Sequence, residues 1–178
     1  SFAPNLILIS AWIPLTSLIA VLALLLEFCS LLSKGDRTKM TKEPLFAGLV
    51  VDESDRAVES AMVGSEPCYV VDDNGFRRHI PAEQIDRQIL DKMREQIEGH
   101  EDILGEETAK MLGQDDIFSR AMIQKQLENI DEQFEKILES GIPTEGRSYM
   151  GMMGFKIVIN VHGEVIYFEQ PSGLPDEE

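Results

Sequence analysis

The stretch LILISAWIPLTSLIAVLALLL, residues 6–26, contains twenty-one consecutive residues without a charge. At a helical rise of about 1.5 Å per residue it is roughly 31 Å long, which matches the hydrocarbon core of a bilayer. A helix of a soluble domain keeps a polar face for water and does not need so long an apolar run. The stretch therefore predicts a single-pass transmembrane helix, within an anchor at residues 1–33.

Three other interpretations of this stretch fit its sequence less well than a membrane span. A cleavable signal peptide begins with basic residues and ends in small ones, whereas SFAPN precedes the run and LLSKGD follows it. A lipoprotein signal has small residues before its cysteine, whereas Glu27 and Phe28 precede Cys29. A buried helix of a soluble protein is disfavoured because the remaining chain is too short and polar to enclose it. A shorter soluble form that starts at Met40 stays open.

The charges that flank the stretch predict its orientation. Four basic residues follow it, in a linker at residues 34–43, and none precedes it: Lys34, Arg37, Lys39 and Lys42. Basic residues stay on the cytoplasmic side of a membrane. The predicted location is therefore the cytoplasmic membrane, with the N-terminus outside and the C-terminal domain in the cytoplasm.

A lone membrane helix is expected to pack beside others. Small residues allow two helices to approach closely, and a proline is tolerated as a kink. The residues predicted to make this packing face are Ser10, Pro14, Ser17 and Ala20. The expected partners are other integral membrane subunits.

Charge is distributed unevenly along the chain. Residues 1–42 carry a net charge of +2 and residues 43–178 a net charge of −18, which together give the −16 of the whole chain. A domain this acidic is repelled by phosphate backbones, so nucleic-acid binding is not expected. A basic soluble protein is a possible partner of the acidic surface, although a solvated surface also accounts for the charge.

The remaining pattern predicts an α+β domain at residues 44–170, followed by an acidic tail at 171–178. Short apolar runs bounded by turn residues are typical of strands, and Asn74-Gly75 is a hairpin signal. The pair Asp115-Asp116, just before a helical pattern, is typical of a helix N-cap. Apolar residues that recur every three to four positions after Pro81 indicate helices. The prediction is an antiparallel sheet of about six strands packed with a helical hairpin. The expected strands are 45–51, 57–63, 68–71, 76–80, 155–161 and 164–170, and the expected helices are 82–98, 105–112 and 115–140.

A family resemblance covers residues 45–85. It is carried by three segments, GLVVDE at 48–53, VVDDNGF at 70–76 and HIPAEQI at 79–85. They resemble the strand–turn pattern of a PRC-barrel domain. The overall plan is similar to that of the H subunit of photosynthetic reaction centres. The resemblance implies a structural subunit that caps a membrane complex, with no catalytic residues.

No motif in the chain names a reaction. The histidines His79, His100 and His162 lack metal-ligand spacing, and no phosphate-binding loop is present. Neither catalytic nor cofactor-binding nor metal-binding residues are predicted. One segment, at residues 149–155, has a soft and adaptable apolar composition. It is expected to be either a loop packed under the helices as part of the core or a docking surface for a partner. The candidate docking residues are Tyr149, Met150, Met152, Met153 and Phe155.

These patterns favour a non-catalytic accessory subunit of a multi-subunit membrane complex, with photosynthetic and respiratory complexes as candidate hosts. The alternative is a membrane-tethered adaptor that recruits a basic soluble partner through its acidic domain. An enzyme is a third class, for which no nucleophile or base can be named.

Overall fold

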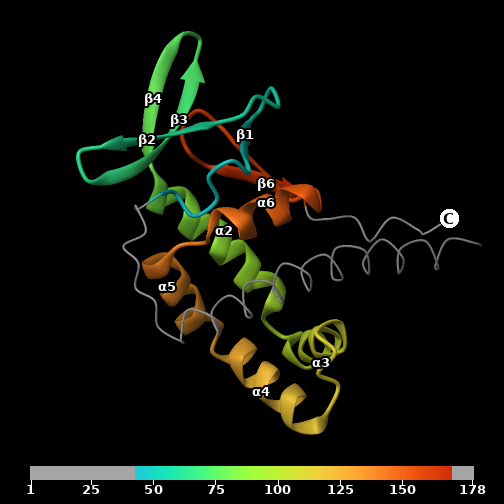
Figure 1. Ribbon diagram of the computed structural model, residues 1–178. Coiled ribbons are helices and arrows are strands. Elements are labelled where there is room, and N and C mark those ends of the chain that lie inside the picture. The colour runs from blue at the N-terminus through green and yellow to red at the C-terminus, as the bar shows by residue number, and fades with distance from the viewer. Residues whose placement is uncertain (1–42, 170–178) are drawn as a thin grey trace, which may run out of the picture.

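The computed structural model describes residues 43–169, which form an α+β domain. Figure 1 shows the strands gathered at one end and the helices α3 and α4 at the other. The strands are β1 (Val50–Asp52), β2 (Glu59–Val63), β3 (Glu66–Asp73), β4 (Phe76–Pro81), β5 (Lys156–Ile159) and β6 (Val165–Glu169). The helices are α2 (Ala82–Ile97), α3 (Glu101–Met111), α4 (Ile117–Glu128), α5 (Ile130–Ser140) and α6 (Thr144–Met152).

The structure corrects the prediction of a single-pass membrane protein. Among residues 43–169, no helix is both long and apolar enough to cross a membrane. The longest described helix, α2, has 16 residues and a mixed polar and apolar sequence. Neither a single-pass fold nor a location in the cytoplasmic membrane is therefore supported. The predicted anchor, its packing residues Ser10, Pro14, Ser17 and Ala20, most of the linker and the acidic tail lie outside the described residues.

The strands form two small sheets, where a single antiparallel sheet was predicted. One sheet has the order β2-β3-β4 and is antiparallel throughout. The other has the order β1-β5-β6, and β1 runs parallel to β5 with Val50 opposite Ile157. A parallel pair needs a long crossover connection, and here the β2-β3-β4 sheet and the helices α2 to α6 together supply it. The predicted strand at 45–51 is shorter than expected because Pro44 and Phe46 accept the turn hydrogen bonds from Ala47 and Leu49.

Local signals in the sequence are confirmed at two positions. Asn74 and Gly75 both have positive φ angles, 53° and 90°, and join β3 to β4 in a tight hairpin. Asp116 caps α4 by accepting a hydrogen bond from the Ser119 amide at 2.9 Å. Both features follow from the intrinsic preferences of these residue types.

The helix expected at residues 115–140 is divided into α4 and α5. Asn129 lies between them with φ −108° and ψ 36°, outside the helical range. Its side-chain amide donates to the Lys125 carbonyl at 2.9 Å, which satisfies an acceptor at the end of α4. Asparagine competes in this way with the helical hydrogen-bond pattern. The expected hairpin of helices is found instead between α3 and α4, which pack against each other.

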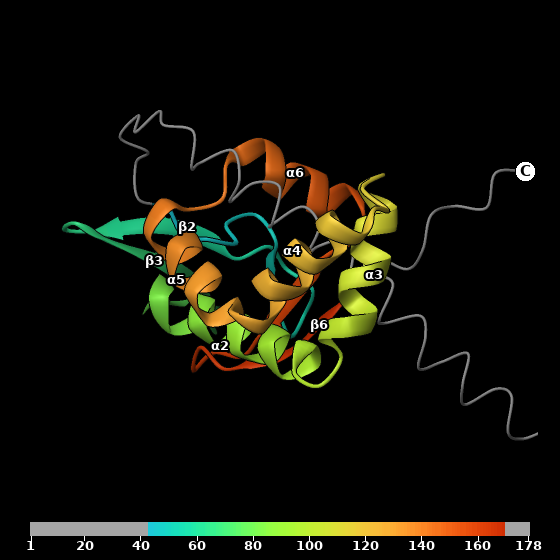
Figure 2. The same ribbon diagram turned by 90° about the horizontal axis from the view of Figure 1, so that it is seen from below.

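One core holds both sheets and the helices together. Helix α2 contributes the residues of its apolar stripe, and their spacing of three and four places them on one face. These side chains belong to one buried cluster with Phe46 from the N-terminal segment, Tyr69 from β3 and Ile157 from β5. The stripe is Ala82, Ile85, Ile89, Leu90, Met93 and Ile97. Seen from below, α2, α4 and α5 lie in front of the strands (Figure 2).

Candidate functional site

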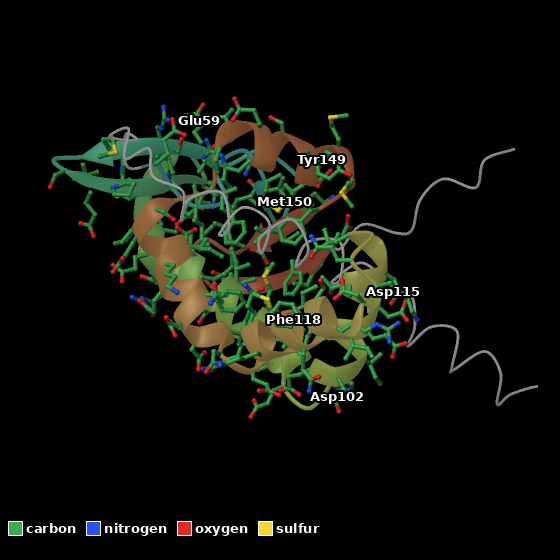
Figure 3. The ribbon with its side chains drawn as sticks, turned by 60° about the horizontal axis from the view of Figure 1, so that its bottom comes forward. Glu59, Asp102, Asp115, Phe118, Tyr149 and Met150 are labelled. Carbon is green, nitrogen blue, oxygen red and sulfur yellow. The ribbon has the colours of Figure 1, made fainter. Side chains whose placement is uncertain are left out.

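The predicted docking patch is not a single surface. Its sequence was expected to be a loop, but Tyr149 and Met150 lie on helix α6, as Figure 3 shows. Met150 and Phe155 are buried core residues, with 1% and 2% of their surface exposed. Tyr149 and Met152 point into solvent, and Met153 is half-buried. The methionine-rich segment therefore fills the core with some of its side chains and exposes others.

A concave site lies where four segments of the chain meet. It is a cavity of about 560 Å³ between residues 43–45, the turn from β2 to β3, the start of α2 and the end of α5. These segments come together beside the β2–β3 turn, at the left of Figure 1. The apolar part of its lining is Leu45, Pro67, Ala82 and Leu138.

The charge of this cavity is strongly one-sided. Six carboxylate side chains line it, against a single cationic one, that of Arg87. Arg87 is already engaged, because its guanidinium donates to Glu83 at 2.8 Å and to Glu135 at 2.8 Å. The hydrogen bond from Arg87 lowers the pKa of Glu135, which keeps that carboxylate ionised. The six carboxylates are those of Glu43, Glu66, Glu83, Asp86, Glu135 and Glu139.

Asp86 differs from the other five carboxylates because it is buried. One of its oxygens accepts the Leu45 amide at 3.0 Å, and the other accepts the Tyr69 hydroxyl at 2.7 Å. The Tyr69 oxygen in turn accepts the Phe46 amide at 3.1 Å. Burial raises the pKa of Asp86 to about 6, and burial next to Asp86 raises the pKa of Tyr69 well above its ordinary value. The network fixes the segment at residues 45–46 to α2 and β3, since buried amides need acceptors.

This network accounts for the burial of Asp86. Each of its carboxylate oxygens accepts a hydrogen bond from within the protein. A general base is normally paired with a nucleophile or an orienting partner. In the described part of the chain, the cavity lining contains neither histidine nor cysteine nor lysine. Asp86 therefore acts as a positioning residue for the wall of the cavity.

A second, smaller pocket of about 390 Å³ shares Glu43 with the acidic cavity. Arg147 from α6 lines it and is buried, with 7% of its surface exposed. Its guanidinium donates to the Pro44 carbonyl at 3.2 Å and to the Glu43 carboxylate at 2.5 Å. These bonds anchor the N-terminal segment to α6, so Asp86 and Arg147 hold residues 43–46 from two sides.

The histidines and the cysteine of the described domain are dispersed over the fold. His79 lies on β4, His100 precedes α3 and His162 lies in the turn between β5 and β6, and all three are exposed. Among residues 43–169, no group of three or more histidine, cysteine, aspartate or glutamate side chains could hold a metal ion. Cys68 is buried, and burial raises the pKa of its thiol, which disfavours the reactive thiolate.

Sequence reasoning missed the acidic cavity, although one signal was available. Asp86 falls on the apolar stripe of α2, four positions after Ala82 and three before Ile89. A charged residue at a core-facing position needs a buried partner, and so marks a special site. Apart from Glu83, which lies on the same helix, the other lining carboxylates come from distant segments and could not be grouped without the fold.

Comparisons with protein-family models, with curated proteins and with solved structures find no match to this chain. The resemblance of residues 45–85 to a PRC-barrel domain therefore stays a prediction. In the structure, the strands of this segment belong to two different sheets.

Proposed function

We propose that this protein is a non-catalytic adaptor domain that binds a basic segment of another protein in its acidic cavity. The observation that carries the proposal is the lining of the 560 Å³ cavity, which combines six carboxylates, one arginine and several apolar side chains. A lysine or arginine side chain fits such a site, because its aliphatic part packs on apolar residues while its charged end meets carboxylates.

The exposure and the incomplete ion pairing of the lining carboxylates support a cationic ligand. Glu43, Glu66 and Glu139 are exposed, and no ion pair of Glu66 or Glu139 is found within residues 43–169. Arg87 balances only part of the charge of Glu83 and Glu135. Several unneutralised carboxylates around one concavity produce a negative potential that attracts a cationic partner and speeds its association.

The position of the cavity also suits a binding site. Its walls come from α2, α5 and the β2–β3 turn, and Asp86 and Arg147 fix the segment at residues 43–46 that borders it. A wall held on both sides by buried hydrogen bonds keeps its shape when a ligand binds. Such preorganisation lowers the entropy cost of association.

The test is a binding titration with a lysine- and arginine-rich peptide, measured by fluorescence anisotropy at several salt concentrations. The cavity variant is Glu66→Gln combined with Glu139→Gln. The control variant, Glu53→Gln combined with Glu95→Gln, makes the same change in net charge at exposed positions outside the cavity lining.

We expect the cavity variant to raise the Kd of the peptide about fivefold, from roughly 0.5 kcal/mol for each exposed charge pair. The control variant should change the Kd much less, and added salt should weaken binding to the wild type. No binding of the basic peptide, or an equal loss in the two variants, would show that the cavity is not the recognition site.

A further inference from the structure

The described domain begins at the rim of the acidic cavity. Glu43, its first residue, and Leu45 both line the cavity. The chain is fixed at this point, because Asp86 accepts the Leu45 amide and the buried Arg147 donates to the Glu43 carboxylate and the Pro44 carbonyl. The residues that directly precede Glu43 therefore enter the domain beside the cavity.

The six residues that precede Glu43 are rich in positive charge. Their sequence is RTKMTK, at residues 37–42, with three cationic side chains and no carboxylate. We call residues 37–42 the basic segment. It directly precedes residues 43–178, whose net charge is −18. A strongly acidic domain thus follows a short run of the opposite charge.

The lining of the cavity complements the basic segment in charge and in apolar contact. Glu66 and Glu139 line it and have no ion pair within the described part of the chain. Among the described residues of the lining, Arg87 is the single cationic one, and two glutamates already share it. The apolar side chains of the lining can pack against the aliphatic parts of lysine and methionine. The cavity thus offers free carboxylates beside an apolar surface.

The basic segment is long enough to reach across the cavity. An extended chain covers about 3.3 to 3.6 Å per residue, so six residues span roughly 20 Å from Glu43, which is ample for a cavity of about 560 Å³. Because the segment is covalently joined to the rim, its effective concentration at the cavity is about millimolar. Even a weak intrinsic affinity then fills a large fraction of the cavities.

We infer that the basic segment binds in the acidic cavity of its own domain, as an internal ligand that a basic partner protein has to displace. The inference rests on the proposed function, because it takes the same cavity as a site for cationic chains. It adds regulation to that site. A partner must compete with a ligand held at about millimolar effective concentration, so strongly basic partners bind and sparsely charged ones are excluded.

A zero-length cross-link tests the contact directly. A water-soluble carbodiimide joins an amine to a carboxylate that touches it. Treatment of the full chain should link Lys39 to Glu66 or Glu139, as identified by mass spectrometry of proteolytic peptides. Glu53 and Glu95, which are exposed outside the cavity lining, should not be linked to Lys39. A mixture of unlabelled and isotope-labelled chains should give cross-linked products of a single label, because the link forms within one chain.

A competition measurement tests the consequence for a partner. The segment variant combines Arg37→Gln, Lys39→Gln and Lys42→Gln. It should bind the lysine- and arginine-rich peptide with a Kd at least about twofold lower than the wild type, because a half-filled cavity becomes free. The control variant should lower the Kd much less. It makes the same change in net charge at three positions outside the cavity lining: Lys92→Gln, Lys110→Gln and Lys125→Gln.

The two experiments separate this inference from the proposed function. If the peptide binds neither the wild type nor the segment variant while Lys39 is still linked to the cavity, the proposed function is wrong and the internal ligand stands. If the peptide binds both chains with the same Kd, or Lys39 is linked no more to the cavity than to Glu53 and Glu95, the inference is overturned. Products that join two labels would place the segment in the cavity of a second copy, and would overturn it as well.

Discussion

The substitution Asp86→Asn removes the titrating group of the buried network while keeping its shape. In the folded protein, burial raises the pKa of Asp86 from 3.8 to about 6. The carboxyl is 4% exposed, so solvent screens this effect little. The folded state therefore holds a proton on Asp86 at pH values where the unfolded chain has released it.

The sign and size of the effect follow from this difference. A group with a raised pKa contributes stability that is fully present below its unfolded pKa and is lost as the pH rises through its folded pKa. The difference between pKa values of 3.8 and about 6 corresponds to about 3 kcal/mol. The free energy of unfolding of the wild type should thus fall by about 3 kcal/mol relative to Asp86→Asn between about pH 3 and pH 7.

The assay is urea unfolding of both proteins at a series of pH values, with the difference in unfolding free energy plotted against pH. Subtraction removes the contribution of the other carboxylates, which both proteins share. The control is Asp91→Asn, at an exposed aspartate of α2 that lies 3.6 Å from Arg94. Asp91→Asn makes the same change in charge on the exposed side of α2, away from the buried network. A flat or rising curve for Asp86→Asn would refute the assignment of a buried, proton-holding carboxyl.

Three further experiments test a tight turn, the core packing and the cap of α4. Gly163→Ala should destabilise the protein by about 2 kcal/mol more than Gly64→Ala, measured by thermal unfolding. Both glycines have a positive φ, so the backbone strain of an alanine is shared by the two variants. Only at Gly163 would the added Cβ clash, because it would lie 2.7 Å from a methyl group of Ile80. Met150→Ala should cost about 3 kcal/mol and Met152→Ala less than about 0.5 kcal/mol in urea unfolding, because only the first is buried. Asp116→Ala should cost about 1 kcal/mol through loss of the cap, measured in the same way, and an unchanged stability would contradict the capping role.

The parts of this fold that could be predicted are those set by local chemistry. The stripe of α2, the hairpin at Asn74-Gly75 and the cap at Asp116 each depend on residues close together in sequence. The break at Asn129 was not predicted because apolar spacing continues through it from Leu127 to Ile130. Only the backbone angles of Asn129 reveal that one helix ends there and another begins.

The arrangement of the elements could not be predicted, because it depends on distant contacts. The parallel pairing of β1 with β5 has no local signal, and hairpin patterns alone suggested one antiparallel sheet. The long apolar stretch at residues 6–26 directed the interpretation towards a membrane, whereas no helix among residues 43–169 is long and apolar enough to cross one. The acidic cavity likewise exists only once α2, α5 and the β2–β3 turn are brought together.

The pairing of β1 with β5 also constrains the order in which the domain can form during synthesis. Val50 leaves the ribosome about 100 residues before its partner Ile157, so β1 at first has only its local bridge from Val51 to Ala57. The α3–α4 hairpin joins residues close in sequence and can form while the chain is still growing. Completion of the β1-β5-β6 sheet is thus expected to be the late step, and until then the apolar side of β1 is open to association with other nascent chains.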